Sequence, residues 1–132
     1  MVTSVRRVDF YDCDPAGIIF FANIFKMAHS AYEEMLKNFK LAENYFSSEE
    51  FVIPIIKSEA EFIKTISFGD TLRIMLHATQ VKNSSFELTY EFRNMEQLTV
   101  ARVKTVHVFV RKENFEKTDL PEDLRKKLVS VA

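Results

Sequence analysis

The sequence has few of the residues that interrupt regular secondary structure, with only two glycines and three prolines among 132 residues. Turns that need a positive φ angle or a proline ring are therefore few, and an ordered chain with long regular elements is expected. No hydrophobic run approaches the roughly 20 apolar residues of a membrane-spanning helix, which excludes such a helix. The first dozen residues become polar and acidic, which is atypical of a secretory signal.

Cysteine and charge of one sign are also scarce. The single cysteine, Cys13, excludes an internal disulfide and is typical of a reducing compartment, so a cytoplasmic location is expected. Eighteen basic and 19 acidic side chains leave a net charge of -1, which argues against nucleic-acid binding through a basic field. No dinucleotide-binding, P-loop or serine-hydrolase signature occurs. The three histidines lack metal-ligand spacing, so no metal site is expected.

Apolar residues make up 47% of the chain, which is enough for one hydrophobic core and predicts a single domain over residues 1–132. Near the start, apolar residues alternate with charged ones and predict a first strand over 4–11. Apolar residues then recur every three or four positions. This spacing predicts one long amphipathic helix over 18–39, with Asn23 as its N-cap.

Period-two alternation predicts four further strands in the rest of the chain. They cover residues 52–66, 72–78, 86–92 and 98–111, with turns at 69–70, 83–84 and 94–97. Turns of hairpin length predict that these strands form an antiparallel meander. In the last strand both Val103 and Val106 are apolar, which a bulge or partial cover on both faces would explain. A capping box at Asp119, followed by Pro121, predicts a short helix through Lys127.

This order predicts an α+β fold, in which the long helix covers one face of a sheet of about five antiparallel strands. One helix is too narrow to cover a sheet of that width. We therefore expect a second copy of the chain to bury the remaining apolar surface, as in a homo-oligomer. Five phenylalanines are expected in the core rather than in a ligand-binding cage, namely Phe10, Phe20, Phe62, Phe86 and Phe92.

The densest cluster of turn-forming residues lies between the first strand and the helix, and its sequence is Asp12-Cys13-Asp14-Pro15-Ala16-Gly17. Its two carboxylates have two interpretations. In a structural role, Asp12 caps a turn and Asp14 begins one, as Asp before Pro often does. In a catalytic role, one carboxylate points toward the helix N-terminus, where unpaired N–H groups stabilise an oxyanion, and it attacks an acyl carbon or activates water.

The run from Asp12 to Asn23, DCDPAGIIFFAN, resembles the signature of the 4-hydroxybenzoyl-CoA thioesterase family of hotdog-fold acyl-CoA hydrolases. The resemblance continues through the helix and, more weakly, over residues 52–111. It implies a hotdog fold, in which a curved antiparallel sheet wraps one long central helix. It also implies homodimers that pair their sheets edge to edge, often within a homotetramer, with active sites at the subunit interface. No cofactor is implied, because CoA is part of the substrate.

The resemblance also implies roles for single residues of the signature. Asp14 matches the catalytic second Asp of the family and would act as nucleophile, through an acyl-enzyme anhydride, or as general base for water. The backbone N–H of Phe21 would polarise the thioester carbonyl. Relatives carry a histidine at that position, so the backbone donor is retained here and any role of a histidine side chain is lost.

Gly17, His29 and Tyr32 are candidate substrate contacts. His29 lies on the apolar stripe of the helix, where it is either a hydrogen-bonded core or interface residue or a contact to a substrate hydroxyl. The stretch from Lys26 to Glu33 is similar to that of thioesterases that act on 1,4-dihydroxy-2-naphthoyl-CoA. This similarity favours an aromatic acyl group, such as 4-hydroxybenzoyl or 1,4-dihydroxy-2-naphthoyl.

Lys82 matches a position where the family has basic residues near the CoA phosphates, and Arg111 and Lys112 are similar candidates. Lys82 is equally consistent with a solvated surface side chain, and Arg111 and Lys112 have less support than Lys82. Cys13 is expected to be an inert thiol, because no histidine is near it in the sequence. Two other functions stay open. One is an acyl-CoA or acyl-carrier-protein binding module without turnover, and the other is a hotdog dehydratase that pairs Asp14 with His29.

Overall fold

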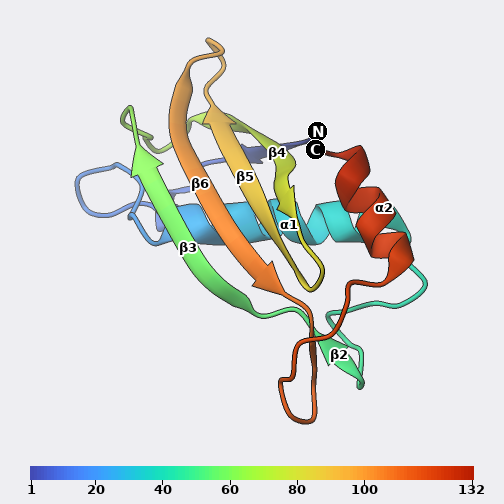
Figure 1. The fold of residues 1–132 in the computed structure, drawn as a ribbon. Helices are drawn as coiled ribbons and strands as arrows, with labels where there is room; N and C mark the ends of the chain where they lie inside the picture. Colours follow the sequence, from blue (N-terminus) through green and yellow to red (C-terminus); the bar gives the residue numbers. More distant parts are fainter.

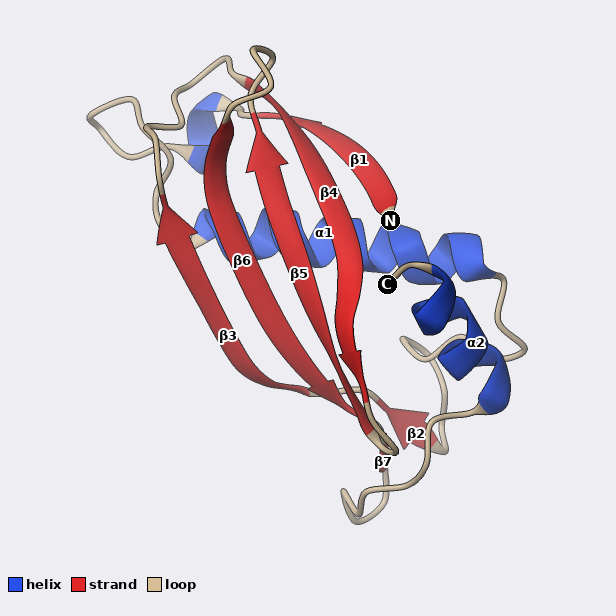
Figure 2. Ribbon diagram, turned by 45° about the horizontal axis from the view of Figure 1, so that its top comes forward, coloured by secondary structure: helices blue, strands red, loops and turns tan.

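The computed structural model describes all 132 residues and confirms the α+β class. A single long helix, α1 (Asn23–Phe39), lies across the inner face of a curved five-stranded antiparallel sheet (Figures 1 and 2). The sheet has the order β1-β4-β5-β6-β3. Its strands are β1 (Val2–Arg7), β3 (Ile55–Phe62), β4 (Thr71–Val81), β5 (Ser85–Arg93) and β6 (Thr99–Val108). Outside this sheet, β2 (Phe51–Val52) pairs with β7 (Val110–Arg111), and the chain ends with α2 (Glu122–Ser130).

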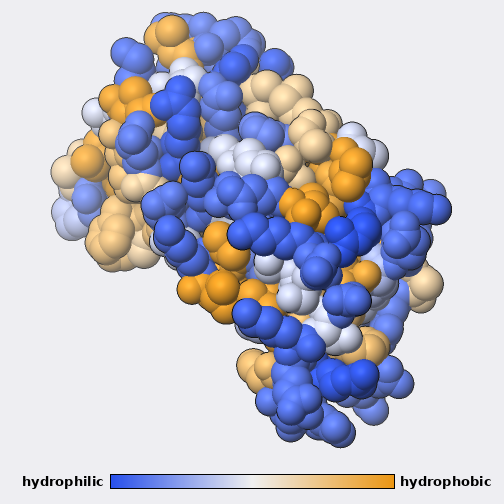
Figure 3. All heavy atoms as spheres, viewed as in Figure 1, coloured by the Kyte–Doolittle hydropathy of each residue, from blue (hydrophilic) through white to orange (hydrophobic).

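The core lies between α1 and the inner face of the sheet. Every second side chain of β5, from Phe86 to Phe92, is buried, and the side chains between them are half-exposed and mostly polar. The buried positions of α1 recur at helical spacing, as expected for a helix packed on one side; they are Ile24, Met27, Ala28, Ala31, Tyr32, Met35, Leu36 and Phe39. Figure 3 shows that hydrophilic atoms cover most of the opposite face of the sheet.

The meander prediction is wrong for the first of the four strands. Hairpins join β4, β5 and β6, but β3 pairs with β6 at the far edge of the sheet and not with β4. The connection between β3 and β4 instead pairs with the segment before α1. There the N–H of Ile19 donates to the carbonyl of Ile66, and the N–H of Phe68 donates to the carbonyl of Gly17. These long-range bonds cannot be seen in the spacing of the turns.

Both long apolar runs are split where the strand pairing is interrupted. The strand predicted over 52–66 divides into β2 and β3 around Pro54, which has no N–H to donate to a ladder. The strand predicted over 98–111 divides into β6 and β7 at Phe109. The N–H of Phe109 donates to the carbonyl of Ser84 at 2.8 Å, in the register of the β5–β6 ladder, and the next residue, Val110, pairs with Val52 of β2.

Partial cover on both faces explains the mixed phase at Val103 and Val106, and a bulge occurs earlier in the same strand. A bulge in β6 leaves Val100 without a partner on β5, so Val100 and Ala101 are both buried. Val103 then faces the core, and Val106 is half-buried on the opposite face.

The first predicted strand begins and ends at other residues than expected, whereas the long helix ends at Phe39 as predicted and differs only at its start. β1 stops at Arg7, and Phe10–Asp12 form a turn of 3-10 helix. α1 begins at Asn23 and not at residue 18, and Asn23 is not its N-cap. Its side chain instead donates to the carbonyl of Asp12 at 2.8 Å. Of the five phenylalanines expected in the core, Phe86 and Phe92 are buried and Phe10, Phe20 and Phe62 are exposed.

The C-terminal helix packs beside β4, with Leu124 and Leu128 fully buried (Figure 1). It begins after Pro121, and the capping box predicted at Asp119 does not form. Arg125 donates to two carbonyls of the β4–β5 turn, which ties α2 to the sheet. Neither α1 nor α2 has the length and apolar character of a membrane-crossing helix.

Candidate active site

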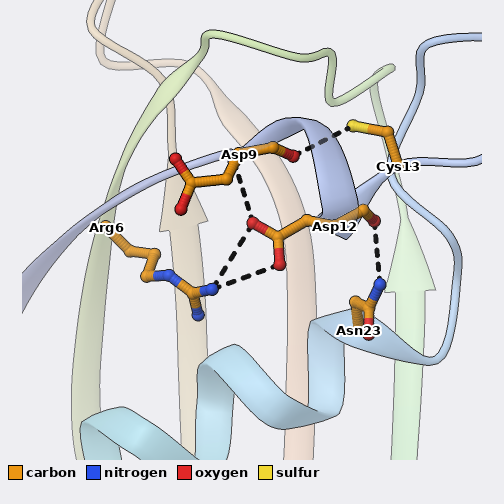
Figure 4. Close-up of polar contacts among 5 residues, drawn as sticks. All are labelled: Arg6, Asp9, Asp12, Cys13 and Asn23. Carbon is orange, nitrogen blue, oxygen red and sulfur yellow. Dashed lines mark hydrogen bonds and ion pairs between the residues drawn. The ribbon is translucent and has the colours of Figure 1, made fainter.

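Asp12 ties together the segments that lead into α1 (Figure 4). Its side chain is almost fully buried and accepts hydrogen bonds from the guanidinium of Arg6 at 3.2 Å and from the N–H of Asp9 at 2.8 Å. Its carbonyl accepts from the side chain of Asn23 at 2.8 Å and from the N–H of Phe20 at 2.9 Å. The structural role predicted for Asp12 is therefore confirmed, and both oxygens of its carboxylate accept hydrogen bonds from the chain.

Asp14 begins the tight turn that follows, as predicted. One oxygen of its carboxylate accepts from the N–H of Ala16 at 2.9 Å, and its carbonyl accepts from the N–H of Gly17 at 2.9 Å. Gly17 closes the turn with a φ of 81°, a conformation that L side chains rarely adopt. The second carboxylate oxygen of Asp14 accepts no hydrogen bond from the chain, and the side chain is half-exposed. This oxygen is available to a bound molecule.

The residues just before α1 present unpaired backbone donors. The N–H groups of Phe21 and Ala22 donate to no acceptor of the chain, whereas the N–H of Phe20 is used by Asp12. The N-terminus of a helix also carries positive partial charge. The Phe21 side chain is exposed, so the predicted oxyanion donor lies at an accessible helix end.

A cavity of about 630 Å³ opens between α1 and the inner face of the sheet. Phe25 and His29 of α1 and Ser58 of β3 contribute to its walls, and Tyr90 and Thr105 are the residues of β5 and β6 that line it. We call the hydroxyl-bearing side chains of these last two residues the floor of the cavity.

His29 lines the cavity and is half-exposed. Its Nε2 lies 3.2 Å from a carboxylate oxygen of Glu33, one helical turn further along α1. No hydrogen bond or ion pair joins His29 to Asp14, the pair that a dehydratase would require. Tyr32, the other candidate on α1, is only 2% exposed, and its ring packs against that of His107 at 4.4 Å. Tyr32 therefore lies in the core, behind the residues that line the cavity.

Three polar residues of the site were not singled out by the sequence analysis. Tyr90, Thr105 and His107 are joined by hydrogen bonds of 2.9 Å and 2.7 Å on the inner face of the sheet. Their signal in the sequence is that polar residues occupy positions where period-two alternation demands apolar ones. In β6 the bulge at Val100 hides this signal, because it shifts the phase of the strand.

The candidate CoA-binding residues lie at the opposite end of the sheet from the Asp14 turn. Lys82 lies in the β4–β5 turn and Arg111 in β7, and both are exposed. The guanidinium of Arg111 lies over the ring of Phe51, 5.7 Å from its centre. Lys112 follows Arg111 and is also exposed. Figure 2 shows the β4–β5 turn and β7 at the bottom of the sheet, far from the loop that precedes α1.

Cys13 is a poor nucleophile in this environment. Burial raises the pKa of its thiol, and the carboxylates of Asp12 and Asp14 raise this pKa further, so the thiol stays protonated. The Sγ donates to the carbonyl of Asp9 at 3.7 Å. No three His, Cys, Asp or Glu side chains of the chain come together in an arrangement that could hold a metal ion.

Comparisons with known proteins agree with this geometry. The model of the thioesterase-like superfamily matches residues 8–128. The 1,4-dihydroxy-2-naphthoyl-CoA hydrolase of Rippkaea orientalis is 32% identical over 129 residues, which cover 96% of this chain and 94% of that protein. The crystal structure of a 1,4-dihydroxy-2-naphthoyl-CoA thioesterase from Synechocystis matches with a TM-score of 0.90 and 29% identity, covering 98% of this chain and 96% of that one. The likeness in structure confirms the predicted hotdog fold.

Substitution of the two carboxylates of the turn should have effects of different size on stability. Asp12→Asn weakens the pairing with Arg6 at a buried position and should lower the free energy of unfolding by about 1–3 kcal/mol. Asp14→Asn keeps an oxygen that can accept from Ala16 and should change it by less than about 0.5 kcal/mol. Urea unfolding of both variants measures the difference. Equal stability of the two variants would show that Asp12 does not hold the loop.

Burial lowers the pKa of His107 to about 3, and the nearby His29 contributes to this lowering. An unfolded chain binds the proton below about pH 6.5, whereas the folded chain does so only near pH 3. Acidification from pH 7 to pH 5 should therefore cost about 2 kcal/mol of stability through this residue alone.

His107→Phe should remove that share of the acid sensitivity, as measured by urea unfolding at pH 7 and pH 5. His77→Gln, on the outer face of β4, should retain it and serves as the control. If His107→Phe lost as much stability as the wild type between pH 7 and pH 5, a neutral, buried imidazole at His107 would be contradicted.

Proposed function

Because the chain belongs to the thioesterase-like superfamily, we propose that it hydrolyses an aromatic acyl-CoA thioester, with 1,4-dihydroxy-2-naphthoyl-CoA as the first candidate and 4-hydroxybenzoyl-CoA as the second. The observation that carries the proposal is the near-complete alignment with hydrolases of the first thioester at about 30% identity. The cavity beside α1 supports it, because 630 Å³ lies within the range of small-molecule sites, about 300–1,000 Å³.

The chemistry follows from the free groups before α1. Asp14 has one carboxylate oxygen without a partner, which either attacks the thioester carbon or takes a proton from the attacking water. The N–H of Phe21 donates to the carbonyl oxygen as it becomes an oxyanion. The C–S bond then breaks, CoA leaves as a thiolate that takes up a proton, and water supplies the second oxygen of the acid.

We further propose that the active unit is a homodimer formed through the free edge of β3. This strand pairs only with β6, and seven of its eight residues are exposed. Ile56 is 64% exposed and Phe62 44%, and Figure 3 shows hydrophobic atoms over the first half of the strand. An edge strand with unpaired backbone N–H and C=O groups is a template for pairing with another chain. A two-fold axis would make that pairing antiparallel and self-complementary.

This arrangement would complete the site from two chains. Antiparallel pairing of two β3 strands places the bottom end of one sheet beside the top end of the other. The exposed Lys82 and Arg111 of one subunit would then approach the Asp14 turn of the second subunit. An acyl-CoA with its thioester at Asp14 would extend its phosphates toward these cations.

Asp14→Asn tests the catalytic role. The substitution removes the charge that attacks or accepts a proton and should lower kcat/KM for the aromatic thioester by at least about 100-fold. Release of CoA, measured with a thiol reagent, gives the rate. Thermal unfolding of the same sample shows whether the fold is intact. A folded Asp14→Asn variant with wild-type kcat/KM would exclude Asp14 from catalysis.

Ile56→Glu tests the dimer. A carboxylate on the β3 edge would be buried without a partner in the pairing, so the variant should sediment as a single chain where the wild type sediments as two or more. Met95→Glu is the matched control, because Met95 is 66% exposed but lies in the β5–β6 turn. Wild-type chains that sediment singly, or an Ile56→Glu variant that stays associated, would rule out this interface.

A further inference from the structure

The floor of the cavity is one end of a buried chain of hydrogen bonds. The hydroxyl of Tyr90 lies 2.9 Å from that of Thr105, and the Thr105 hydroxyl lies 2.7 Å from Nε2 of His107. All three residues are at most 5% exposed. Tyr90 and Thr105 line the cavity, whereas His107 lies behind them in the core. The O–H groups of Tyr90 and Thr105 can therefore point only toward a neighbour in the hydrogen-bonded chain or into the cavity.

The imidazole of His107 is neutral and has one unpaired nitrogen. Its ring is stacked on Phe86, with 4.7 Å between ring centres and 5° between planes, and is flanked by Tyr32 on another side. This apolar setting disfavours a positive charge. Nδ1 is buried and has no hydrogen-bond partner. The single ring hydrogen is thus either on Nδ1, without an acceptor, or on Nε2, facing Thr105.

The position of that hydrogen decides what the floor offers to a ligand. With hydrogen on Nδ1, the Thr105 hydroxyl donates to Nε2 and the Tyr90 hydroxyl donates to Thr105, so the cavity meets only acceptors. With hydrogen on Nε2, the chain holds three hydrogens for two links, and one hydroxyl hydrogen is left to enter the cavity. Buried N–H groups without acceptors are rarer than unpaired acceptors, which favours hydrogen on Nε2.

We propose that the Tyr90–Thr105–His107 chain selects the acyl group by presenting one hydroxyl donor at the floor of the cavity. Its partner is an oxygen substituent on the aromatic ring of the acyl group. This inference rests on the proposed function and names the part of the cavity that recognises the substrate. Tyr90 and Thr105 are the contact residues, and His107 is a positioning residue that sets the direction of the chain.

The expected selectivity follows from the burial of the floor. A ligand without the ring oxygen leaves the donor unpaired at the floor, where Tyr90 and Thr105 are at most 5% exposed, and an unpaired buried donor costs about 1–3 kcal/mol. This cost corresponds to a preference of about tenfold or more for the hydroxylated ligand. An exposed donor would give no such preference, because water would replace the missing oxygen.

Binding of thioether analogues tests the inference independently of turnover. The probes are the analogues of 1,4-dihydroxy-2-naphthoyl-CoA and of 2-naphthoyl-CoA in which CH2 replaces the thioester carbonyl, and calorimetry measures Kd. The wild type should bind the hydroxylated analogue at least about tenfold more tightly. Tyr90→Phe and Thr105→Val should reduce this ratio to below about threefold, and Thr105→Ser should restore it. Tyr45→Phe, a buried tyrosine outside the cavity lining, should keep the wild-type ratio.

A second readout reports the position of the hydrogen. In the 15N NMR spectrum of the wild type, the His107 ring should show a protonated Nε2 and a bare Nδ1, and the hydroxylated analogue should shift the Nε2 signal more than the other analogue. Hydrogen on Nδ1 would overturn the proposal, as would a wild type without preference. A Kd ratio that survives both Tyr90→Phe and Thr105→Val would also overturn it. If one variant fails to fold, the other decides.

Hydrolysis assays on the same proteins separate this inference from the proposed function. Thioester cleavage without the expected Kd ratios would leave the hydrolase and contradict only the role of the floor. The expected Kd ratios without cleavage of any thioester would contradict the hydrolase and support the floor as a recognition element. Absence of binding to both analogues, together with absence of cleavage of any aromatic thioester, would contradict both.

Discussion

The geometry before α1 depends on the buried carboxylate of Asp12. The side chain of Asp12 binds Arg6 of β1 and the backbone N–H of Asp9. The backbone carbonyl of Asp12 binds Phe20 and Asn23 at the start of the helix. A buried carboxylate is stable only when charged or N–H donors surround it, so these segments adopt one arrangement. The turn at Asp14 and the unpaired N–H groups of Phe21 and Ala22 lie within or beside the segment that these bonds hold.

The inner face of the sheet must be apolar where it packs against α1 and polar at the floor of the cavity. Phe86, Leu88 and Phe92 supply the apolar side chains on β5. The polar side chains of Tyr90 and Thr105 interrupt this apolar face at the floor of the cavity. A buried polar group is tolerated when it is hydrogen-bonded, which explains why the hydroxyls form a chain with His107 instead of standing alone.

Local patterns predicted much of the fold, because they depend on spacing along the chain. The alternation around Phe86–Phe92 and most of the helical stripe from Ala28 to Phe39 were correctly assigned, since each reflects one buried face. Errors arose where distant segments supply the partners. The pairing of β3 with β6 is set by bonds of the 63–70 connection to residues near Gly17. Asn23 was misassigned as a cap because its partner, the Asp12 carbonyl, lies 11 residues away.

The sequence by itself determined the fold class, the turn at Asp14 and the resemblance of the segment 12–23 to a thioesterase signature. Spacing and residue type suffice for these, because the interactions that carry them are local. Only the tertiary structure decided that Asp12 is buried and Asp14 available, and that Lys82 lies at the far end of the sheet. It also joined Tyr90 to Thr105 and His107, because cross-strand contacts depend on register, which a single bulge changes.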